Sequence, residues 1–166
     1  IMTHHVKGIV ERKEPVSISH LCDVDPRQID RMAKTMEGFQ SRPANRTLRF
    51  EDVIGDRNVD AVIIATPHHW HAPIALAAMM EGKDVYIEKP ISHVYNEGHL
   101  IIEAAKKYKR VVQQGSQMRN SAVTKKAERL LRQGIIGEVK VARAWTAETR
   151  GIVKPVPDGI APRGVD

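Results

Sequence analysis

Polar side chains that could bind a ligand or take part in catalysis follow four short apolar segments of this chain. Asp23 follows the first segment, Thr66 the second and the pair Glu88-Lys89 the third, while the fourth runs into the stretch 113–117, which contains three glutamines. Carboxylate, amine, hydroxyl and amide groups bind polar ligands, and the first two also move protons. In an open sheet of parallel strands, ligands bind outside the carboxyl ends of the strands. The four groups therefore predict a binding site at one edge of such a sheet.

The elements that would position these groups alternate between apolar strands and helical patterns. The predicted strands cover 16–22, 47–50, 59–66, 84–88 and 110–114. Apolar residues at helical spacing predict helices over the first dozen residues, 26–37, 51–56, 73–80, 96–108 and 121–133. Asp25 is expected to cap the second helix, with Pro26 in its first turn. This alternation predicts an α/β fold with a doubly wound parallel sheet and helices on both faces.

The predicted order begins with a helix, whereas a doubly wound fold begins with a strand and a glycine-rich turn that binds pyrophosphate. None of the eleven glycines forms G-x-G. We therefore expect a Rossmann-like sheet that lacks its first strand and glycine-rich loop, in a chain truncated at both ends.

Asp23 would then close the second strand of the fold, where a carboxylate receives the adenosine ribose hydroxyls of NAD. The alternative is an ordinary loop or cap carboxylate, although Asp25 already fills the capping role. A carboxylate at this position would repel the 2′-phosphate of NADP. Arg27 lies close by and could partly offset that repulsion, so NAD is expected and NADP stays possible.

The loop Thr66-Pro67-His68-His69-Trp70-His71 is the densest polar stretch of the chain. Its three histidines raise the alternative of a zinc site, but their spacing matches no structural zinc pattern and no cysteine accompanies them. We predict no metal and a loop that lines a ligand before a helix begins. Trp70 either packs under this loop or touches the ligand, and a plain core role for it stays open.

Glu88-Lys89-Pro90 ends a buried strand, where a lysine is costly unless it faces a cleft or a partner. Beside a dinucleotide, Lys89 could hold a substrate oxygen or exchange a proton with it. The alternative is a surface pair with Glu88, which would contribute little to stability. Gln117 and Arg119 follow the last strand, where loop hydrogen bonding is the alternative to ligand binding.

The composition excludes several other classes of protein. With 166 residues and 42% hydrophobic residues, the chain is long enough for a core, and no apolar run reaches the roughly 20 residues of a membrane span. The single cysteine, Cys22, rules out an internal disulfide and is expected to be a buried, inert thiol. The net charge is +6, but the basic stretches 106–110 and 125–132 have the pattern of solvated helix faces. We expect neither a nucleic-acid nor a membrane partner.

At these residues the sequence resembles the glucose–fructose oxidoreductase / inositol dehydrogenase / MocA family. The matching motifs cover nearly the whole chain and are 22–25, 59–67 with His69-Trp70-His71, 82–90, 115–117 and 134–139. The resemblance implies a dinucleotide-binding domain over 1–137. Residues 138–166 would begin an α/β substrate domain, and the alternating apolar pattern at 138–147 predicts its first strand.

The resemblance also implies roles for individual residues. Lys89 would lie beside nicotinamide and substrate as the catalytic residue, and Asp23 would bind adenosine ribose. The remaining residues that we predict to bind the cofactor are Thr66, Pro67, His69, Trp70, His71, Glu88, Pro90 and Gln117. Lys89 is expected to contact the cofactor as well.

The function implied is that of an oxidoreductase acting with NAD(P) on a CH–OH group of a sugar, polyol or derivative. The alternatives are an NAD-dependent glycosidase of the same family and a non-catalytic binding protein on the same fold. We expect this fragment alone to be inactive, and the full-length protein to be a cytoplasmic homo-oligomer.

Overall fold

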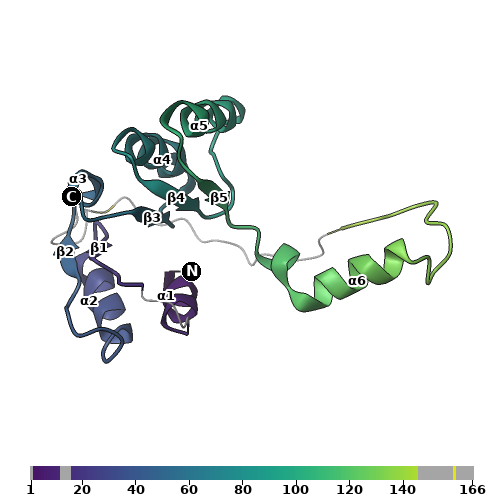
Figure 1. Cartoon of the computed structure of the whole chain (residues 1–166), viewed down its shortest axis with the longest axis horizontal. Coiled ribbons are helices and arrows are strands. Elements are labelled where there is room, and N and C mark those ends of the chain that lie inside the picture. Colours follow the sequence, from purple (N-terminus) through teal and green to yellow (C-terminus); the bar gives the residue numbers. More distant parts are fainter. Residues whose placement is uncertain (1, 12–15, 146–158, 160–166) are drawn as a thin grey trace. The chain divides into compact units, whose positions relative to one another are not determined.

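The computed structural model describes residues 2–11, 16–145 and 159, and it divides the chain into two compact units that meet after Gly115 (Figure 1). The elements are α1 (Met2–Val10), β1 (His20–Cys22), α2 (Pro26–Thr35), β2 (Asn45–Thr47), α3 (Phe50–Gly55), β3 (Ala61–Ile64), η1 (His68–Trp70), α4 (His71–Met80), β4 (Asp84–Ile87), α5 (Tyr95–Tyr108), β5 (Val112–Gln114), η2 (Gln117–Asn120) and α6 (Ala122–Arg132). The elements through β5 belong to the first unit, and η2 and α6 belong to the second.

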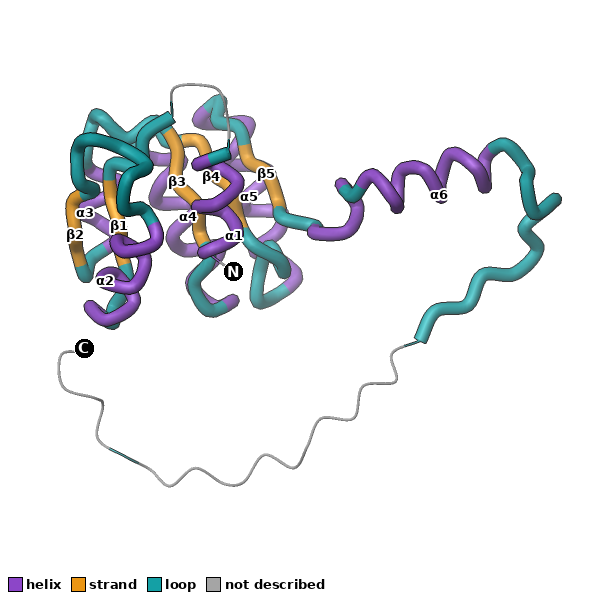
Figure 2. The backbone as a smooth tube through the Cα atoms, turned by 90° about the horizontal axis from the view of Figure 1, so that it is seen from below, coloured by secondary structure: helices purple, strands orange, loops and turns teal. Residues whose placement is uncertain are grey.

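The first unit contains two parallel sheets instead of the single sheet predicted. One sheet pairs β1 with β2, and the other has the order β3-β4-β5 (Figure 2). A doubly wound fold has the strand order 3-2-1-4-5-6, in which the first strand lies between the second and the fourth. The described strands take places 2 to 6 of that order, so β1 and β3 flank the place of the first strand. The predicted α/β Rossmann-like class is confirmed.

Helices cover both faces of the three-stranded sheet. α4 and α5 lie together on one face and α1 lies on the other (Figures 1 and 2). The larger core joins β3 and β4 to α4 and α5, and its most deeply buried large side chains are Met79, Ile87 and Ile101. A smaller core joins α1 and β1 to α2. Each fully buried aliphatic side chain stabilises the fold by about 1.5–3 kcal/mol, so these cores hold the sheets in place.

Several predicted element boundaries shift for identifiable reasons. Asp25 caps α2 as predicted, because its side chain accepts a hydrogen bond from the N–H of Arg27, and Pro26 is the first helical residue. β1 covers only the last part of the predicted strand 16–22, because it pairs over three residues with β2. The strand predicted at 47–50 lies earlier, at β2, because Phe50 already begins α3. α4 begins at His71, two residues before the predicted start.

The strand predicted over 138–147, in the second unit, is not found among the described residues. Residues 138–145 form no strand, and residues 146 and 147 of the predicted segment lie outside the described residues. A half-exposed strand needs a neighbour to satisfy its backbone groups. Within the described part of this unit, no second strand is present to supply one. The domain boundary at 137/138 concerns the whole protein and stays a prediction.

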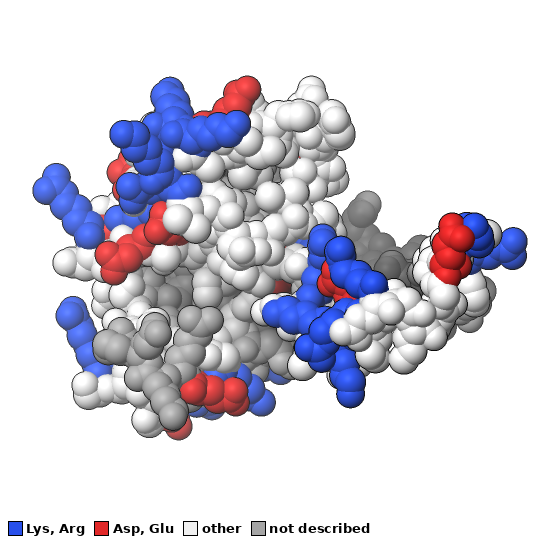
Figure 3. All heavy atoms as spheres, turned by 45° about the vertical axis from the view of Figure 1, so that its right-hand side comes forward, with Lys and Arg blue, Asp and Glu red and all other residues white. Residues whose placement is uncertain are grey.

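The surface of the described residues is mixed in charge. Lys and Arg side chains gather in patches with acidic side chains among them (Figure 3), as in the pair between Arg132 and Glu128 on α6. No helix among the described residues is long and apolar enough to cross a membrane.

Cys22 is exposed, which corrects the expectation of a buried thiol. It ends β1 at the edge where the loops begin. The protein atoms around the sulfur and the nearby carboxylates of Asp23, Asp52 and Glu51 raise the pKa of the thiol to about 11. With this raised pKa the thiol is protonated at neutral pH, which disfavours a role as a nucleophile.

Lys83 links α3 to the start of β4 from a buried position. Its ammonium group donates to the carbonyl oxygen of Asp56 at 2.6 Å, and the residue is 5% exposed. We expect Lys83→Met to lower the free energy of unfolding by about 0.5–1.5 kcal/mol, because it removes one of the two hydrogen bonds that the carbonyl oxygen of Asp56 accepts, the other coming from the N–H of Val59. Urea unfolding checks this, with Lys34→Met on the exposed face of α2 as the matched control. Equal stability of the two variants would contradict the structural role of Lys83.

Candidate functional site

The carboxyl ends of β3, β4 and β5 meet at one edge of their sheet. The N–H of Glu88 donates to the carbonyl oxygen of Ile64 at 2.9 Å, and the N–H of Gly115 donates to that of Ile87 at 2.7 Å. These bonds continue the ladders past the last residue of each strand. The loops that carry the predicted site residues after β3 and β4 therefore begin side by side.

Glu88 and Lys89 occupy different environments at the end of β4. Lys89 and Pro90 are exposed, whereas Glu88 is 5% exposed. Glu88 accepts the backbone N–H of Lys89 on Oε2 at 3.1 Å, and its Oε1 lies 2.7 Å from Nε2 of His5 in α1. A simple surface pair between Lys89 and Glu88 does not describe this geometry, because Glu88 is buried and bonded to other groups.

Glu88 is an ionised carboxylate at neutral pH. Burial raises the pKa of Glu88, but the hydrogen bonds from His5 and from the N–H of Lys89, with the charges around it, outweigh burial and hold the pKa below its usual value. The stabilisation that comes from this shift is present above the ordinary glutamate pKa. It is lost as the pH falls through the lower pKa of the folded state.

His71 is buried and ties the loop after β3 to the loop after β4. Its Nδ1 lies 2.7 Å from the carbonyl oxygen of Pro90, and its Nε2 lies 2.9 Å from that of Thr66. The residue is 1% exposed, so both ring nitrogens face the main chain rather than the open edge. The geometry gives His71 the role of holding the two loops. Direct contact with a cofactor, which the sequence predicts, is untested and would need the ring to leave these partners.

The rest of the loop after β3 is exposed. Thr66, Pro67 and His69 face solvent, and Trp70 is 45% exposed with its ring 6.0 Å from that of Phe50 at the start of α3. The loop after β3 therefore contacts the segment after β2. Trp70 lies beside Phe50 and keeps part of its ring accessible, and its contact with a ligand stays a prediction. No group of three His, Cys, Asp or Glu side chains among the described residues is arranged to hold a metal ion.

Asp23 is half-buried directly after β1. Its Oδ1 accepts the N–H of Asp25 at 2.9 Å, and its own N–H donates to the carbonyl oxygen of Thr47 at 3.4 Å. Arg27, the cation that could favour NADP, is bound by Asp25, whose two carboxylate oxygens accept from Nε and a terminal nitrogen at 2.8 Å each. Arg27 is therefore paired with Asp25 rather than with Asp23.

Gln117 begins η2 in the second unit, with a left-handed backbone at φ 46°. Its place in the site stays a prediction. Three residues that the sequence did not single out join the site from the first unit. They are His5, Tyr86 and Gly115, and Gly115 is buried so closely that an added Cβ would lie 2.7 Å from the hydroxyl of Tyr86.

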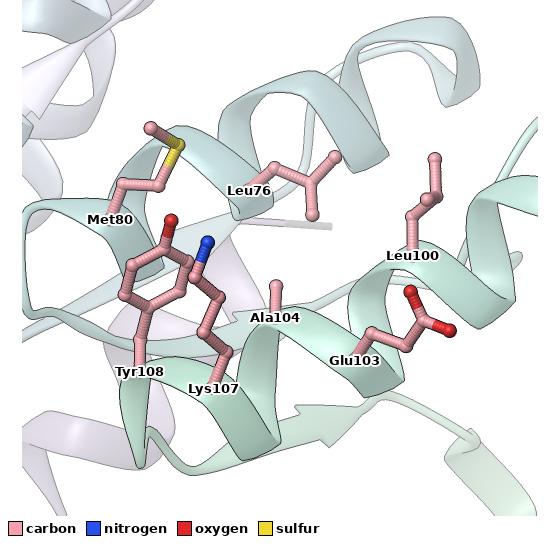
Figure 4. A pocket seen from close by; sticks show the side chains of 7 residues that line it. All are labelled: Leu76, Met80, Leu100, Glu103, Ala104, Lys107 and Tyr108. Carbon is pink, nitrogen blue, oxygen red and sulfur yellow. The ribbon is translucent and has the colours of Figure 1, made fainter.

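One groove of the first unit lies away from the predicted site residues. It has a volume of about 340 Å³ and lies between the C-terminal half of α4 and α5 (Figure 4). Its lining is mostly apolar, and Lys107 extends over the ring of Tyr108 at 5.2 Å. None of the predicted site residues lines it.

Residues 1–116 match the model of a family described as "Oxidoreductase family, NAD-binding Rossmann fold", the glucose–fructose oxidoreductase / inositol dehydrogenase / MocA family. The chain belongs to this family. The match covers all the described elements of the first unit, and it agrees with their α/β architecture.

Two curated relatives are bacterial proteins named glycosyl hydrolase family 109 protein. The one from Shewanella pealeana is 29% identical over 140 residues, and the one from Shewanella amazonensis is 31% identical over 144 residues. The alignments cover 81% and 82% of this chain and 30% of each relative. The chain therefore spans about a third of the length of the curated relatives that it matches.

Solved structures of dehydrogenases share the fold. Myo-inositol 2-dehydrogenase from Lactobacillus plantarum superposes with a TM-score of 0.71 at 23% identity, covering 81% of this chain and 39% of that protein. Scyllo-inositol dehydrogenase from Lactobacillus casei, solved with NAD(H) and scyllo-inositol, gives 0.69 at 22% identity and covers 81% and 38%. The WlbA dehydrogenase from Bordetella pertussis, solved with NADH and UDP-GlcNAcA, gives 0.71 at 21% identity with coverage of 81% and 39%.

Proposed function

We propose that the full-length protein is an NAD-dependent oxidoreductase that acts on a CH–OH group of a sugar, polyol or related compound. The observation that carries the proposal is the exposed Lys89 at the end of β4, with its backbone fixed by the buried carboxylate of Glu88. The family supports the nicotinamide chemistry. The scyllo-inositol and the UDP-GlcNAcA bound in the structures of two neighbours support the carbohydrate-like substrate.

The polar groups at the strand ends are of the types that the two ends of a dinucleotide require. Asp23 offers a carboxylate for the adenosine ribose hydroxyls, and Lys89 offers a cation for the reacting end. Bound nicotinamide would supply the hydride acceptor. Lys89 would hold the substrate oxygen and take up or return its proton, while Glu88 fixes the Lys89 backbone and His71 holds the neighbouring loops.

NAD is proposed over NADP, because a carboxylate at Asp23 would repel a 2′-phosphate and Arg27 is bound by Asp25. We expect Asp23→Ala in the full-length protein to weaken NAD binding by about ten- to hundredfold, since a hydrogen bond to a charged group contributes about 1.5–3 kcal/mol. Isothermal titration calorimetry with NAD measures this. Asp30→Ala is the matched control, because Asp30 is an exposed carboxylate of α2 that pairs with Arg46. Equal affinities of both variants would contradict the ribose role.

A second candidate is a glycosidase of the same family that uses NAD transiently, and the names of the curated relatives favour it. Product analysis of the full-length protein separates the two. Net formation of NADH with an oxidised sugar supports the oxidoreductase, whereas release of a sugar without net NADH supports the glycosidase. Failure to bind NAD would leave the third alternative, a non-catalytic binding protein.

The remaining expectations concern the whole protein. We propose a homo-oligomer located in the cytoplasm, without nucleic-acid or membrane partners. For the 166 residues alone we propose no turnover. The described residues and the sequence contain no G-x-G turn for the pyrophosphate, so this chain offers only part of a dinucleotide site.

A further inference from the structure

A partly buried contact joins α1 to the end of β4. Nε2 of His5 lies 2.7 Å from Oε1 of Glu88, and the His5 ring meets the ring of Tyr86 edge-on with 5.0 Å between centroids. Glu88 uses its other oxygen, Oε2, to accept the backbone N–H of Lys89. The carboxylate of Glu88 is thus held from two sides, by His5 of α1 and by the backbone N–H of Lys89.

The same cluster reaches the end of β5. The hydroxyl of Tyr86 and the carboxylate of Glu88 would lie 2.7 and 3.3 Å from a Cβ at position 115, so only glycine fits there without displacement. The cluster of His5, Tyr86, Glu88 and Gly115 therefore packs α1, β4 and the end of β5 against one another. In a doubly wound fold, the helix in the place of α1 directs its N-terminus at the pyrophosphate.

We propose that His5 is a positioning residue that acts through Glu88 to fix the backbone of Lys89 relative to the helix facing the cofactor. This inference rests on the proposed oxidoreductase function. A glutamate side chain has three rotatable bonds, so the single bond to the N–H of Lys89 does not fix its carboxylate. Without the donor from His5, the charged group is drawn toward water, and the backbone at Lys89 loses its anchor. A displacement of about 1 Å at a reacting group costs about a hundredfold in rate.

The test compares two substitutions that differ by one methylene in the full-length protein. In His5→Gln the amide nitrogen takes the place of Nε2 and keeps the donor, whereas in His5→Asn the amide falls short of Glu88. We expect His5→Asn to lower kcat about ten- to hundredfold with little change in the KM for NAD, and His5→Gln to stay close to wild type. His5→Phe keeps the ring that meets Tyr86 and should behave like His5→Asn.

The inference is overturned if His5→Asn keeps the kcat of the wild type, or if His5→Gln falls as far as His5→Asn. A purely structural role is recognised when loss of activity follows the loss in Tm across the three variants rather than the presence of the donor. Absence of NAD-dependent oxidation in the wild-type protein would instead overturn the proposed function on which the inference depends.

Discussion

Lys89→Ala in the full-length protein is expected to lower kcat by about 10²–10⁴-fold, while the affinity for NAD changes little. Loss of a group that transfers a proton in the transition state has this magnitude. Lys89 is exposed at the strand edge, whereas its neighbour Glu88 is buried, so the substitution removes an accessible cation without opening the core. Steady-state kinetics with the substrate found by product analysis, together with calorimetry for NAD, measures the two quantities separately.

Two controls make this expectation specific. Lys106→Ala removes an exposed lysine from the last turn of α5 and should leave kcat unchanged. Asp23→Ala should change the affinity for NAD and spare the chemical step once the cofactor saturates. If Lys89→Ala kept near-normal turnover while Asp23→Ala abolished it at saturating NAD, both role assignments would be wrong, even though the fold would stand.

His71→Phe is expected to lower the free energy of unfolding by about 1–3 kcal/mol. The ring is buried, and its two nitrogens face the carbonyl oxygens of Pro90 and Thr66. Phenylalanine fills a similar space but has no N–H. An imidazole that carries one N–H donates to one of these two oxygens, so the substitution leaves that carbonyl without its donor, at a cost of about 1–3 kcal/mol. Urea and thermal unfolding of the full-length protein measure the loss.

His99→Phe is the matched control, because His99 lies on the exposed face of α5. A change there should stay within about 0.5 kcal/mol. Equal stability of the two variants would show that the loops after β3 and β4 hold together without His71. Separately, loss of NAD affinity by His71→Phe without loss of stability would favour the direct contact with the cofactor that the sequence predicts.

Much of the architecture can be predicted from the local pattern of residues. Apolar runs and helical spacing predict the alternation of strands and helices. An element that is buried on one or both faces has apolar residues at a regular spacing, and this spacing can be recognised within a short stretch of sequence. The cap at Asp25 and the first helical turn at Pro26 are equally local, since both depend on backbone groups within three residues. The strand ends at Asp23, Thr66 and Glu88-Lys89 follow from the same patterns, and so does the edge on which the last two meet.

The remaining features of the fold and the site depend on contacts between segments that are distant in the sequence. Glu88 and His5 are 83 residues apart, and nothing in the residues near either one indicates that they meet, because the meeting depends on the path of every element between them. His71 illustrates the same limit, since its place in a histidine-rich loop suggests a ligand group while its partner at Pro90 belongs to the next loop.

The corrections have the same physical origin. The segment 138–145 alternates like a strand, but alternation specifies only which side chains could share a face, and a strand forms where a neighbour accepts its backbone hydrogen bonds. The separation of β1-β2 from β3-β4-β5 likewise depends on which strands find partners. The period of apolar residues therefore identifies elements and their exposed ends, whereas pairing and burial between elements depend on the folded chain as a whole.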